Sequence, residues 1–577
     1  MERRVLIAIS LSFLVLFLYQ TFITPARPPQ PPASSNQTPP ASPVAGVTTP
    51  GNLSPESIAA PLPPVTTVIG EPAEREIAIE TKRVRAVFTN RGGRLRHWWL
   101  KDYKNRAGQV LDLVPESVPA PLPVPFSLRV DDTTTTARLN DLFYRSNASS
   151  ASIDGTSQPV TVTFDLETGE GLRAQKTFEL TPDGYDILFS ASVQEGTASD
   201  GNGAPKILNP TIDWGPGLGD DIARTPPGSF LSPNYTYAPQ AIYHENGSVQ
   251  RVSAASLGAG TARDGVFRWV GIDDHYFISA IIQPPAPLHV EYAPVVIATP
   301  STPSPAGRFV SYSARFPAPP QNARFFLGPK QLDALRAVDP EFTRAIYFGM
   351  FSWLAVPLLG ALKWVHGYIG NWGWSIIALT ILINIAMFPL RHKSVVSMRK
   401  MQELQPQMKA IQDRYAKYKI TDPERQKMNQ EVMELYKARG VNPASGCVPM
   451  LLTMPFLFAF YSMLSQAIEL RGAEFAGWIH DLAARDPYYV TPLLMGATMV
   501  WQQRLTPSTA DPTQQKMMMF MPFMFTFIFL GQPSGLAIYW LVSNLWGIGQ
   551  QYFTNYLIGP PKVHNVRPPA ERRVKKG

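Results

Sequence analysis

The pattern of hydrophobic and polar positions divides the chain into three regions. The first begins with an uncharged run of 19 residues, 5–23, which directly follows Arg3 and Arg4. At about 1.5 Å per residue, a helix of this length just spans the hydrocarbon core of a bilayer. A cleaved signal peptide, the alternative, has a shorter apolar region and a small-residue cleavage site. We therefore predict an uncleaved signal-anchor helix in residues 1–24, with its N-terminus held in the cytoplasm by the two arginines.

Short runs with the period of a β-strand dominate the second region. Proline makes up 13 of the 40 residues 25–64, which predicts an extended linker over 25–66. Turn signals such as Arg91-Gly92-Gly93 then separate alternating or β-branched runs, of which the clearest are 76–81, 84–89, 160–166, 185–190, 277–282 and 309–316. No long helical period interrupts them, so residues 67–332 predict a large antiparallel β-sandwich. Because the anchor starts in the cytoplasm, we place this domain on the far side of the membrane.

This domain carries little sign of catalytic chemistry. Its histidines His97, His244, His275 and His289 are scattered, without a zinc-protease HExxH motif or a nucleophile elbow. The most suggestive cluster is Asp273-Asp274-His275. We favour the interpretation that this cluster caps a strand, with catalysis as the alternative.

The third region contains five long apolar stretches, 372–390, 446–468, 488–503, 517–531 and 536–558. A sixth candidate, 349–369, contains Pro357, Lys363 and His366. The segment 391–443 holds 12 Lys and Arg against 6 Asp and Glu, so the positive-inside rule places it in the cytoplasm. Only an odd number of membrane crossings can connect the outer domain to this cytoplasmic segment.

Residues 333–370 therefore predict an amphipathic helix at the outer membrane interface, anchored by Trp353 and Trp364. The result is six spans with both termini in the cytoplasm. The net-acidic loop 469–486 fits the outer side, and the basic tail 560–577 fits the cytoplasm.

Residues 391–440 predict a cytoplasmic helical hairpin. Apolar residues recur there at steps of three and four, and Thr421-Asp422-Pro423-Glu424 supplies a break with N-cap chemistry. A self-packed hairpin with a solvated charged face is favoured over a dedicated binding surface, although both can hold together. Its basic side is a plausible contact for ribosomal RNA, anionic lipid or a targeting factor. The candidate contact residues are Arg391, Lys393, Arg399, Lys400, Lys409 and Arg414.

The five apolar stretches contain no Asp, Glu, Lys, Arg or His. This argues against an ion-coupled pump and against an intramembrane aspartyl or metal protease. Their polar groups are uncharged: Ser375, Thr380, Asn384, Thr453, Ser462, Ser465, Gln466, Ser543, Asn544, Gln550 and Gln551. Singly, each can serve a helix–helix hydrogen bond; together they predict a hydrated, neutral groove, with the two interpretations about equally supported.

One stretch is short. Residues 517–531 would form a helix of about 22 Å, which predicts local bilayer thinning. Its five methionines offer an adaptable apolar surface for varied partners, or equally a lipid-facing filler.

Several ordered motifs closely resemble the YidC membrane protein insertases of the Oxa-type superfamily. They are NWGWSIIALTILINIAMFPL (371–390), MRKMQELQPQMKAIQDRY (398–415), NPASGCVPMLLTMP (442–455), DPTQQKMMMFMP (511–522) and PSGLAIYWLVSN (533–544). The resemblance runs from about Phe325 to Tyr552 and, more weakly, includes the β domain.

This resemblance implies a multi-pass protein of a Gram-negative inner membrane, with a periplasmic β-supersandwich and six transmembrane helices. Five of these, in residues 371–559, would form the insertase core. The resemblance implies no cofactor, metal or nucleotide. The implied partners are nascent membrane proteins, the Sec translocon, the ribosome and signal-recognition machinery, and anionic lipids.

The resemblance also implies a hydrophilic groove open to the cytoplasm and lipid, which receives a client's polar tail. Its candidate residues are Thr380, Asn384, Tyr539, Trp540, Ser462 and Gln466. Thr380 matches the family's groove threonine, and the family's groove aromatic falls on Trp540. The family's groove arginine, however, is replaced by Asn384. Electrostatic capture of acidic tails is therefore in doubt unless Arg391, Lys393 or a neighbouring span compensates.

Two rival functions remain. A small-solute transporter or channel is the stronger, although charge-free spans and the lack of a visible inverted repeat count against it. A saccharide-binding or saccharide-modifying enzyme in the β domain is the other, but paired carboxylates in a convincing context are missing.

Charge and cysteine content support the membrane interpretation. The 577 residues carry a formal net charge of +8 and one cysteine, which excludes an internal disulfide framework and a multi-cysteine metal site. Residues 24–348 contribute −4, and the remaining +12 lies mainly in the hairpin and the tail. The excess charge thus marks a cytoplasmic face and is no sign of DNA binding.

Overall fold

The computed structural model describes residues 66–558, except for 106, 116–123, 197–204, 220–237, 258–260, 286, 298–306, 416–417, 419–421, 441–447 and 506–511. The predicted anchor, most of the predicted linker and the basic tail lie outside the described residues. Within them, one helix, Trp372–Met401, has the length and mean hydropathy (1.9) to cross a membrane, and Met518–Phe529 is a shorter apolar helix. The number of six spans therefore stays a prediction.

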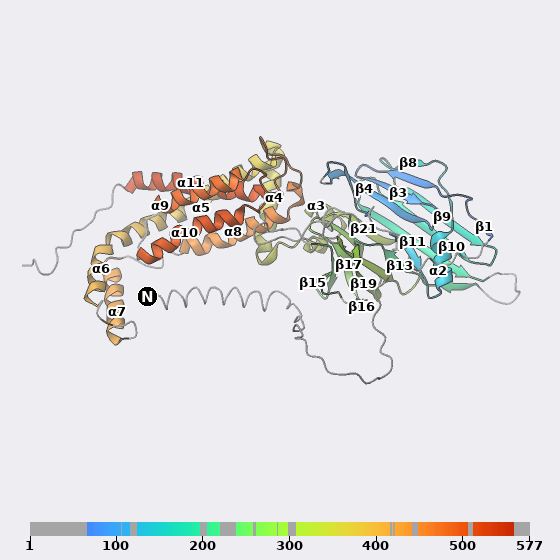
Figure 1. Cartoon of the computed structure of the whole chain (residues 1–577), viewed down its shortest axis with the longest axis horizontal. Coiled ribbons are helices and arrows are strands. Elements are labelled where there is room, and N and C mark those ends of the chain that lie inside the picture. The colour runs from blue at the N-terminus through green and yellow to red at the C-terminus, as the bar shows by residue number, and fades with distance from the viewer. Residues whose placement is uncertain are drawn as a thin grey trace, which may run out of the picture. The chain divides into compact units, whose positions relative to one another are not determined.

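The largest sheet of the β-rich region has 11 strands (Figure 1). Its main path runs β1 (Thr67–Ile69), β9 (Val160–Thr168), β10 (Arg173–Leu180), β11 (Asp186–Glu195), β21 (Ala323–Pro329), β18 (Phe277–Ile282), β17 (Phe267–Asp273), β14 (Gln240–Glu245), β15 (Ser248–Ser253). Off this path, β12 (Lys206–Leu208) pairs with β11, and β7 (Arg145–Ser146) pairs with β9.

Two five-stranded sheets accompany it. One has the order β16 (Thr261–Gly265), β19 (Leu288–Ile297), β20 (Gly307–Arg315), β13 (Thr211–Trp214), β6 (Ser127–Arg129). The other has the order β5 (Val110–Asp112), β4 (Arg94–Lys104), β3 (Val84–Thr89), β2 (Glu76–Glu80), β8 (Ser152–Asp154). The region thus consists mostly of antiparallel sheet, as the alternating pattern predicted.

All six runs that the sequence predicted as strands are strands. Each observed strand begins within three residues of the first residue of the predicted run. Two expectations were too simple. Helix α2 (Thr133–Asp141) interrupts the series, with Asp132 as its N-cap accepting from the backbone N–H of Thr135. The pairing of β2 with β8 is parallel.

Aromatic side chains form the centre of this region. Phe126 is fully buried and packs against four other rings, those of Phe178, Phe189, Phe325 and Trp214, at centroid distances of 4.9–5.9 Å. Trp98 of β4 donates from Nε1 to the carbonyl of Leu327 at 2.8 Å, so it joins the third sheet to the largest one. Burial of rings of this size supplies most of the energy that holds the layers together.

A buried lysine secures the turn Arg91-Gly92-Gly93 that the sequence predicted. Both glycines have positive φ (70° and 55°), and Lys176 donates from Nζ to the carbonyls of Gly92 (2.6 Å) and Phe126 (2.8 Å). The pKa of Lys176 is lowered because burial disfavours its charged form. A side chain at Gly92 would meet the carbonyl oxygen of Asn140 at 2.6 Å, which explains why glycine occupies this position.

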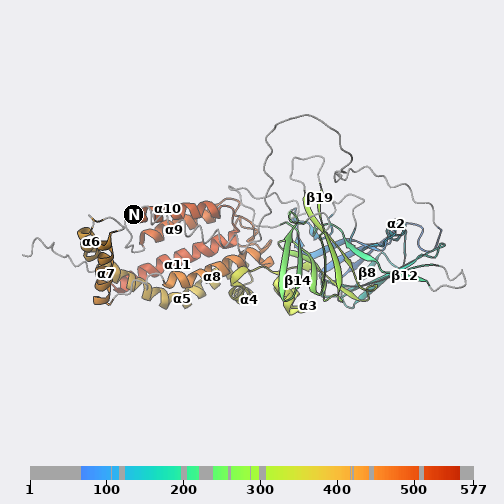
Figure 2. The ribbon, with the colours of Figure 1, turned by 90° about the horizontal axis from the view of Figure 1, so that it is seen from below.

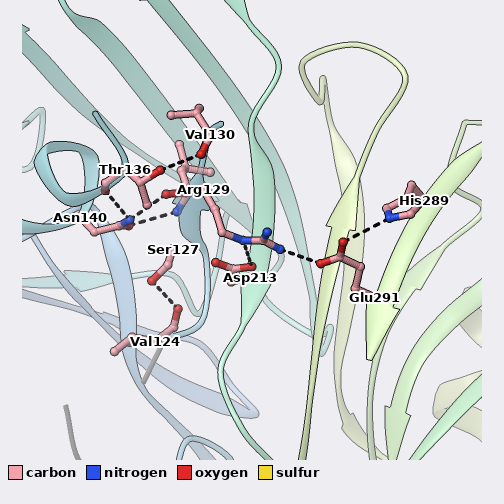
Figure 3. A network of polar contacts seen from close by, with 10 residues as sticks. Val124, Ser127, Arg129, Val130, Thr136, Asn140, Asp213, His289 and Glu291 are labelled. Atoms are coloured by element: carbon pink, nitrogen blue, oxygen red, sulfur yellow. Dashed lines mark hydrogen bonds and ion pairs between the residues drawn. The ribbon is translucent and has the colours of Figure 1, made fainter. Parts of the chain in front are cut away.

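Polar contacts connect α2 to the five-stranded sheet that contains β6, β13 and β19 (Figure 3). Asn140 of α2 donates to the carbonyl of Leu128 at 2.7 Å, and Arg129 pairs with Glu291 at 2.9 Å. Glu291 in turn lies 3.4 Å from His289, the pKa of which is raised by its hydrogen bond to Asp264. These side chains are partly exposed and paired with one another, so we interpret the cluster as structural.

The C-terminal part is helical (Figure 2). Its elements are α3 (Leu332–Val338), η2 (Pro340–Ala345), η3 (Gly349–Phe351), α4 (Ser352–Ile369), α5 (Trp372–Glu403), α6 (Gln405–Arg414), α7 (Pro423–Ala438), α8 (Val448–Gln466), η5 (Ile468–Leu470), α9 (Val490–Leu505), α10 (Pro512–Phe529) and α11 (Ser534–Ile558). Helix α11 packs on α5 and α9, α10 packs on α9, and α4 packs on α5 and α8.

Helix α4 has one face buried in the protein and one face exposed, and its amphipathic, interfacial position stays a prediction. Trp353 and Trp364 are 67% and 62% exposed, whereas Leu359 and Leu362 are buried on its other face. Lys363 pairs with Asp333 of α3 and lies 3.4 Å from Glu469, which belongs to the loop predicted to face outward. The ion pairs keep this lysine among polar groups, which supports an interfacial position over a membrane span.

Two helices differ from their predicted extent. Helix α10 begins five residues before the apolar stretch 517–531, because the polar residues Thr513 to Lys516 continue the same helix. The first arm of the hairpin is divided between α5 and α6 at Leu404, since Pro406 in the first turn of α6 removes a backbone donor. Asp422 caps α7 through the N–H of Glu424, as predicted.

The cluster Asp273-Asp274-His275 caps the turn between β17 and β18. Asp274 Oδ1 accepts from the backbone N–H groups of Tyr276 (2.8 Å) and Phe277 (2.7 Å), which confirms the favoured interpretation. Asp273 pairs with the buried Lys330 at 2.9 Å, and His275 Nε2 lies 2.8 Å from the carbonyl oxygen of Ser465 at the end of α8. The cluster therefore stabilises the junction of the sheets with the helices.

The carboxyl of Asp274 should make the stability of this junction depend measurably on pH. Burial raises the pKa of its carboxyl from 3.8 to about 7, although the two N–H groups and Lys330 act in the opposite direction. Because the folded pKa is the higher one, the stability that this carboxyl contributes is complete below the unfolded pKa. It is lost as the pH rises toward 7, by up to about 1.4 kcal/mol per pH unit.

Asp274→Asn keeps an oxygen for both N–H groups but does not titrate. We expect its unfolding temperature, relative to wild type in detergent, to increase between about pH 5 and about pH 7.5. A difference between the two proteins that does not change with pH would contradict this account.

Candidate functional site

The polar residues of α5 are buried, and two of them, Thr380 and Asn384, lie one turn apart and form a polar line on one face of the helix. Ser375, Thr380 and Asn384 are 0%, 1% and 4% exposed. Thr380 donates from Oγ1 to the carbonyl of Ile376 at 2.6 Å, and Asn384 donates from Nδ2 to the carbonyl of Thr380 at 2.8 Å. Both donors are thus satisfied within the helix, and the Oδ1 atom of Asn384 is left to accept from elsewhere.

Arg391 supplies that donor. Its Nη1 atom donates to Asn384 Oδ1 at 2.8 Å, two helical turns back along α5. The side chain of Arg391 is partly buried. A guanidinium that follows the apolar stretch by one residue therefore reaches back beside Asn384, a contact that residue spacing could not establish.

Aromatic residues line the neighbouring helices. Tyr539 stacks on Phe460 of α8, with ring centroids 4.5 Å apart and planes 10° apart. Trp540 instead packs against Phe525 and Phe529 of α10, at 5.5 and 5.0 Å. The two adjacent aromatics of α11 therefore face different helices, Tyr539 toward α8 and Trp540 toward α10.

Ser462 and Gln466, the two candidates on α8, lie in its last two turns. Ser462 donates from Oγ to the carbonyl of Phe348 at 2.7 Å, which ties α8 to the segment just before α4. Gln466 is the last residue of the helix and is half-buried. The hydroxyl of Ser462 thus has a structural partner, whereas Asn384 bonds both to the carbonyl of Thr380 and to Arg391.

Two polar residues of α11 serve other contacts. Asn544 donates to the carbonyl of Met495 (3.3 Å) and to Thr498 Oγ1 (3.2 Å) on α9, a helix–helix hydrogen bond of the kind weighed from the sequence. Gln550 faces a separate apolar groove between α5 and α11. Gln550 lies four residues after Trp546 and three residues before Phe553. This spacing in the sequence could have placed Gln550 on the same helix face as these two aromatic residues.

The helical hairpin of α5, α6 and α7 packs against itself, as the sequence favoured. Met401, Leu404 and Tyr436 form a small buried cluster between its arms. Of the basic candidates, Arg414 pairs with Glu431 at 2.9 Å and Arg399 is 8% exposed. The exposed candidates are Lys393, Lys400 and Lys409, with Arg414 also largely accessible.

The hydrogen bond of Ser462 should contribute to stability. Ser462→Ala removes the tie to Phe348 and leaves its carbonyl without that donor, so we expect a loss of about 0.5–1.5 kcal/mol. Thermal unfolding in detergent measures this loss. Ser465→Ala is the matched control, because Ser465 Oγ donates within α8 to Ser462, and the variant should unfold close to wild type. Equal effects of the two substitutions would refute the assignment.

Comparison with known proteins identifies both parts of the chain. Residues 364–560 match the family model described as "60Kd inner membrane protein", and residues 76–361 match the "YidC periplasmic domain". A protein of Syntrophus aciditrophicus called membrane protein insertase YidC is 35% identical over 96% of this chain and 99% of its own length.

Two further relatives carry the same name. The protein of Geotalea daltonii is 34% identical over 96% of this chain and 99% of its own. That of Geobacter metallireducens is 35% identical over 96% and 98%. In these three relatives the match extends over nearly the whole length of both chains, and both family models match in order. The chain therefore belongs to the YidC family of inner-membrane proteins with a periplasmic domain.

Proposed function

We propose that the chain is a membrane protein insertase, which moves nascent membrane proteins into the inner membrane. It is not an enzyme. The relatives that match nearly its full length are named for this activity. The observation in the structure that carries the mechanism is the buried polar line of α5, with the Arg391 guanidinium bonded to Asn384.

The line Thr380–Asn384 and Tyr539 would form the client groove. A polar tail entering hydrocarbon loses its hydrogen bonds to water, at a cost of several kcal/mol for each unpaired group. A groove lined by amide, hydroxyl and guanidinium groups, and hydrated from the cytoplasm, lowers that cost. The apolar segment of the client can meanwhile remain in contact with lipid. Trp540 and its partners on α10 would form the wall beside the groove.

Arg391 would give the groove the positive charge that Asn384 does not carry. The hydrogen bond fixes the guanidinium beside the polar line, where an acidic tail would meet it. In a partly desolvated setting, the attraction between unlike charges is stronger than in bulk water. Of the residues named from the sequence as possible replacements for the family's groove arginine, Arg391, seven positions along the same helix, would be the one that supplies the charge.

The proposed topology has six transmembrane helices with both termini in the cytoplasm. Helix α4 would lie along the outer interface, and the β-rich domain would be periplasmic. The basic excess of residues 391–443 and the ion pairs of Lys363 with Asp333 and Glu469 support this arrangement. The exposed lysines of the hairpin are candidate contacts for the ribosome, the signal-recognition machinery or anionic lipids. The Sec translocon is a further proposed partner.

A solute transporter or channel is the alternative. Asn544 and Ser462 use their side chains to hold helices and segments together, which leaves fewer polar groups to line a continuous path. The alternative would require solute flux through the purified protein.

Arg391→Gln should reduce insertion of an acidic-tailed client more than that of the same client with an uncharged tail. Glutamine removes the charge, and its shorter side chain also gives up the hydrogen bond to Asn384 two turns away. We expect about a threefold to tenfold loss for the acidic tail, which corresponds to about 0.6–1.4 kcal/mol. Protease protection in vesicles containing the purified protein measures insertion.

The matched control is Lys393→Gln, which removes one positive charge from an exposed position two residues away. It should leave the preference for acidic tails unchanged. Asn384→Asp should neutralise Arg391 and impair acidic-tailed clients more than Asn384→Ala does. Equal losses for acidic and uncharged tails in Arg391→Gln would show that the charge plays no part in recognition.

A further inference from the structure

The segment that joins the β-rich region to helix α4 is held against the largest sheet. It comprises residues 339–347, includes η2, and will be called the linking segment. Asp339 at its start accepts from the Nε (2.8 Å) and Nη2 (2.9 Å) atoms of Arg268 on β17. Near its other end, Arg251 of β15 donates to the carbonyl oxygen of Ala345 at 2.8 Å. Two arginines of the sheet therefore fasten the linking segment close to both of its ends.

His244 of β14 lies in the contact between the sheet and the middle of the linking segment. The side chain is 5% exposed, and its ring stacks on that of Trp269 with centroids 5.6 Å apart. Trp269 in turn packs against Phe342 of η2 at 5.3 Å. Neither ring nitrogen of His244 has a hydrogen-bond partner among the described residues, and Nε2 lies 4.0 Å from a carboxylate oxygen of Glu341. The imidazole thus takes part in this contact as a packed ring.

A proton on His244 would enter a buried site that already carries more positive than negative groups. The charged groups on the elements that face it are Arg251 of β15, Arg268 of β17, and Asp339, Glu341 and Arg344 of the linking segment. Both carboxylates already have an arginine partner. Burial and the nearby Arg344 lower the pKa of His244 from its ordinary value of 6.5, although Glu341 acts in the opposite direction. Near neutral pH the packed imidazole is therefore uncharged.

We propose that the linking segment is a pH-sensitive latch, which ties α4 to the β-rich domain at neutral pH and is released when His244 binds a proton. Release would expose the imidazole to water, where it binds a proton at about pH 6.5. The released form then holds more protons than the packed form, so acid favours release and the latch is fully closed only above about pH 6.5.

The effect of release would be local. The β-rich domain has a separate contact with α8 through His275, so the freedom gained would be confined to the linking segment and the start of α4. In the proposed topology the latch lies on the outer side of the membrane and responds to the pH there. The latch is additional to the insertase groove and does not depend on it.

Hydrogen exchange of the full chain in detergent, read by mass spectrometry of peptides that cover residues 339–347, tests the proposal. The N–H groups of Phe342 and Ile346 donate to backbone carbonyls there and report opening. Dividing each rate by that of an unfolded peptide at the same pH removes the chemical effect of pH. We expect protection to fall about threefold to tenfold from pH 7.5 to pH 5.5, because only the released histidine gains a proton over this range.

His244→Phe keeps a ring for Trp269 but does not titrate, so its protection should be the same at both pH values. His244→Gln is a second variant that does not titrate, with the same expectation. The matched control is His289→Phe, because His289 is partly exposed and bonds to Asp264 at 2.7 Å. This variant should keep the pH dependence of wild type.

Three results would overturn the proposal. They are constant protection in wild type, an equal fall in wild type and both His244 variants, and a fall that extends equally to β17 and β18, which would mark loss of the whole fold. Asp274 cannot account for the expected result, because the stability that it contributes increases as the pH falls.

Discussion

The cost of leaving a hydrogen-bonding group unpaired away from water governs the helical half of this protein. Thr380 and Asn384 satisfy their donors on the carbonyls of their own helix, and this leaves one acceptor, Asn384 Oδ1. Arg391 reaches that acceptor and so brings a cation beside a segment that contains no charge in its sequence. The proposed recognition of acidic tails depends on this one hydrogen bond, because without it the flexible guanidinium would extend toward water.

The same constraint explains how the two halves are joined. The last turns of α8 carry Ser462, which donates to Phe348, and Ser465, whose carbonyl meets His275 of the β-rich domain. Lys363 of α4 lies between Asp333 and Glu469. Each contact pairs a polar group that would otherwise be buried alone.

Pairing also separates structural from functional polar residues. Asn544 holds α9 and Ser462 holds the segment before α4, so each has a complete structural explanation. The buried polar atoms of Gln550 and the Nε1 atom of Trp546 have no such partner among the described residues. From residue type alone, each of these side chains is a polar group in an apolar helix. The hydrogen-bond partner, or the lack of one among the described residues, is what tells them apart.

The sequence by itself determined the strand runs, the turn at Gly92, the cap at Asp422 and the amphipathic face of α4. Each is specified by a few neighbouring residues through periodicity or turn chemistry. It also identified the family, through ordered motifs. Only the tertiary structure decided which polar residues meet, such as Arg391 with Asn384 and Asn544 with α9. The physical reason is that a long side chain can reach along its own helix or across to another, and the packing of the surrounding helices selects between these contacts.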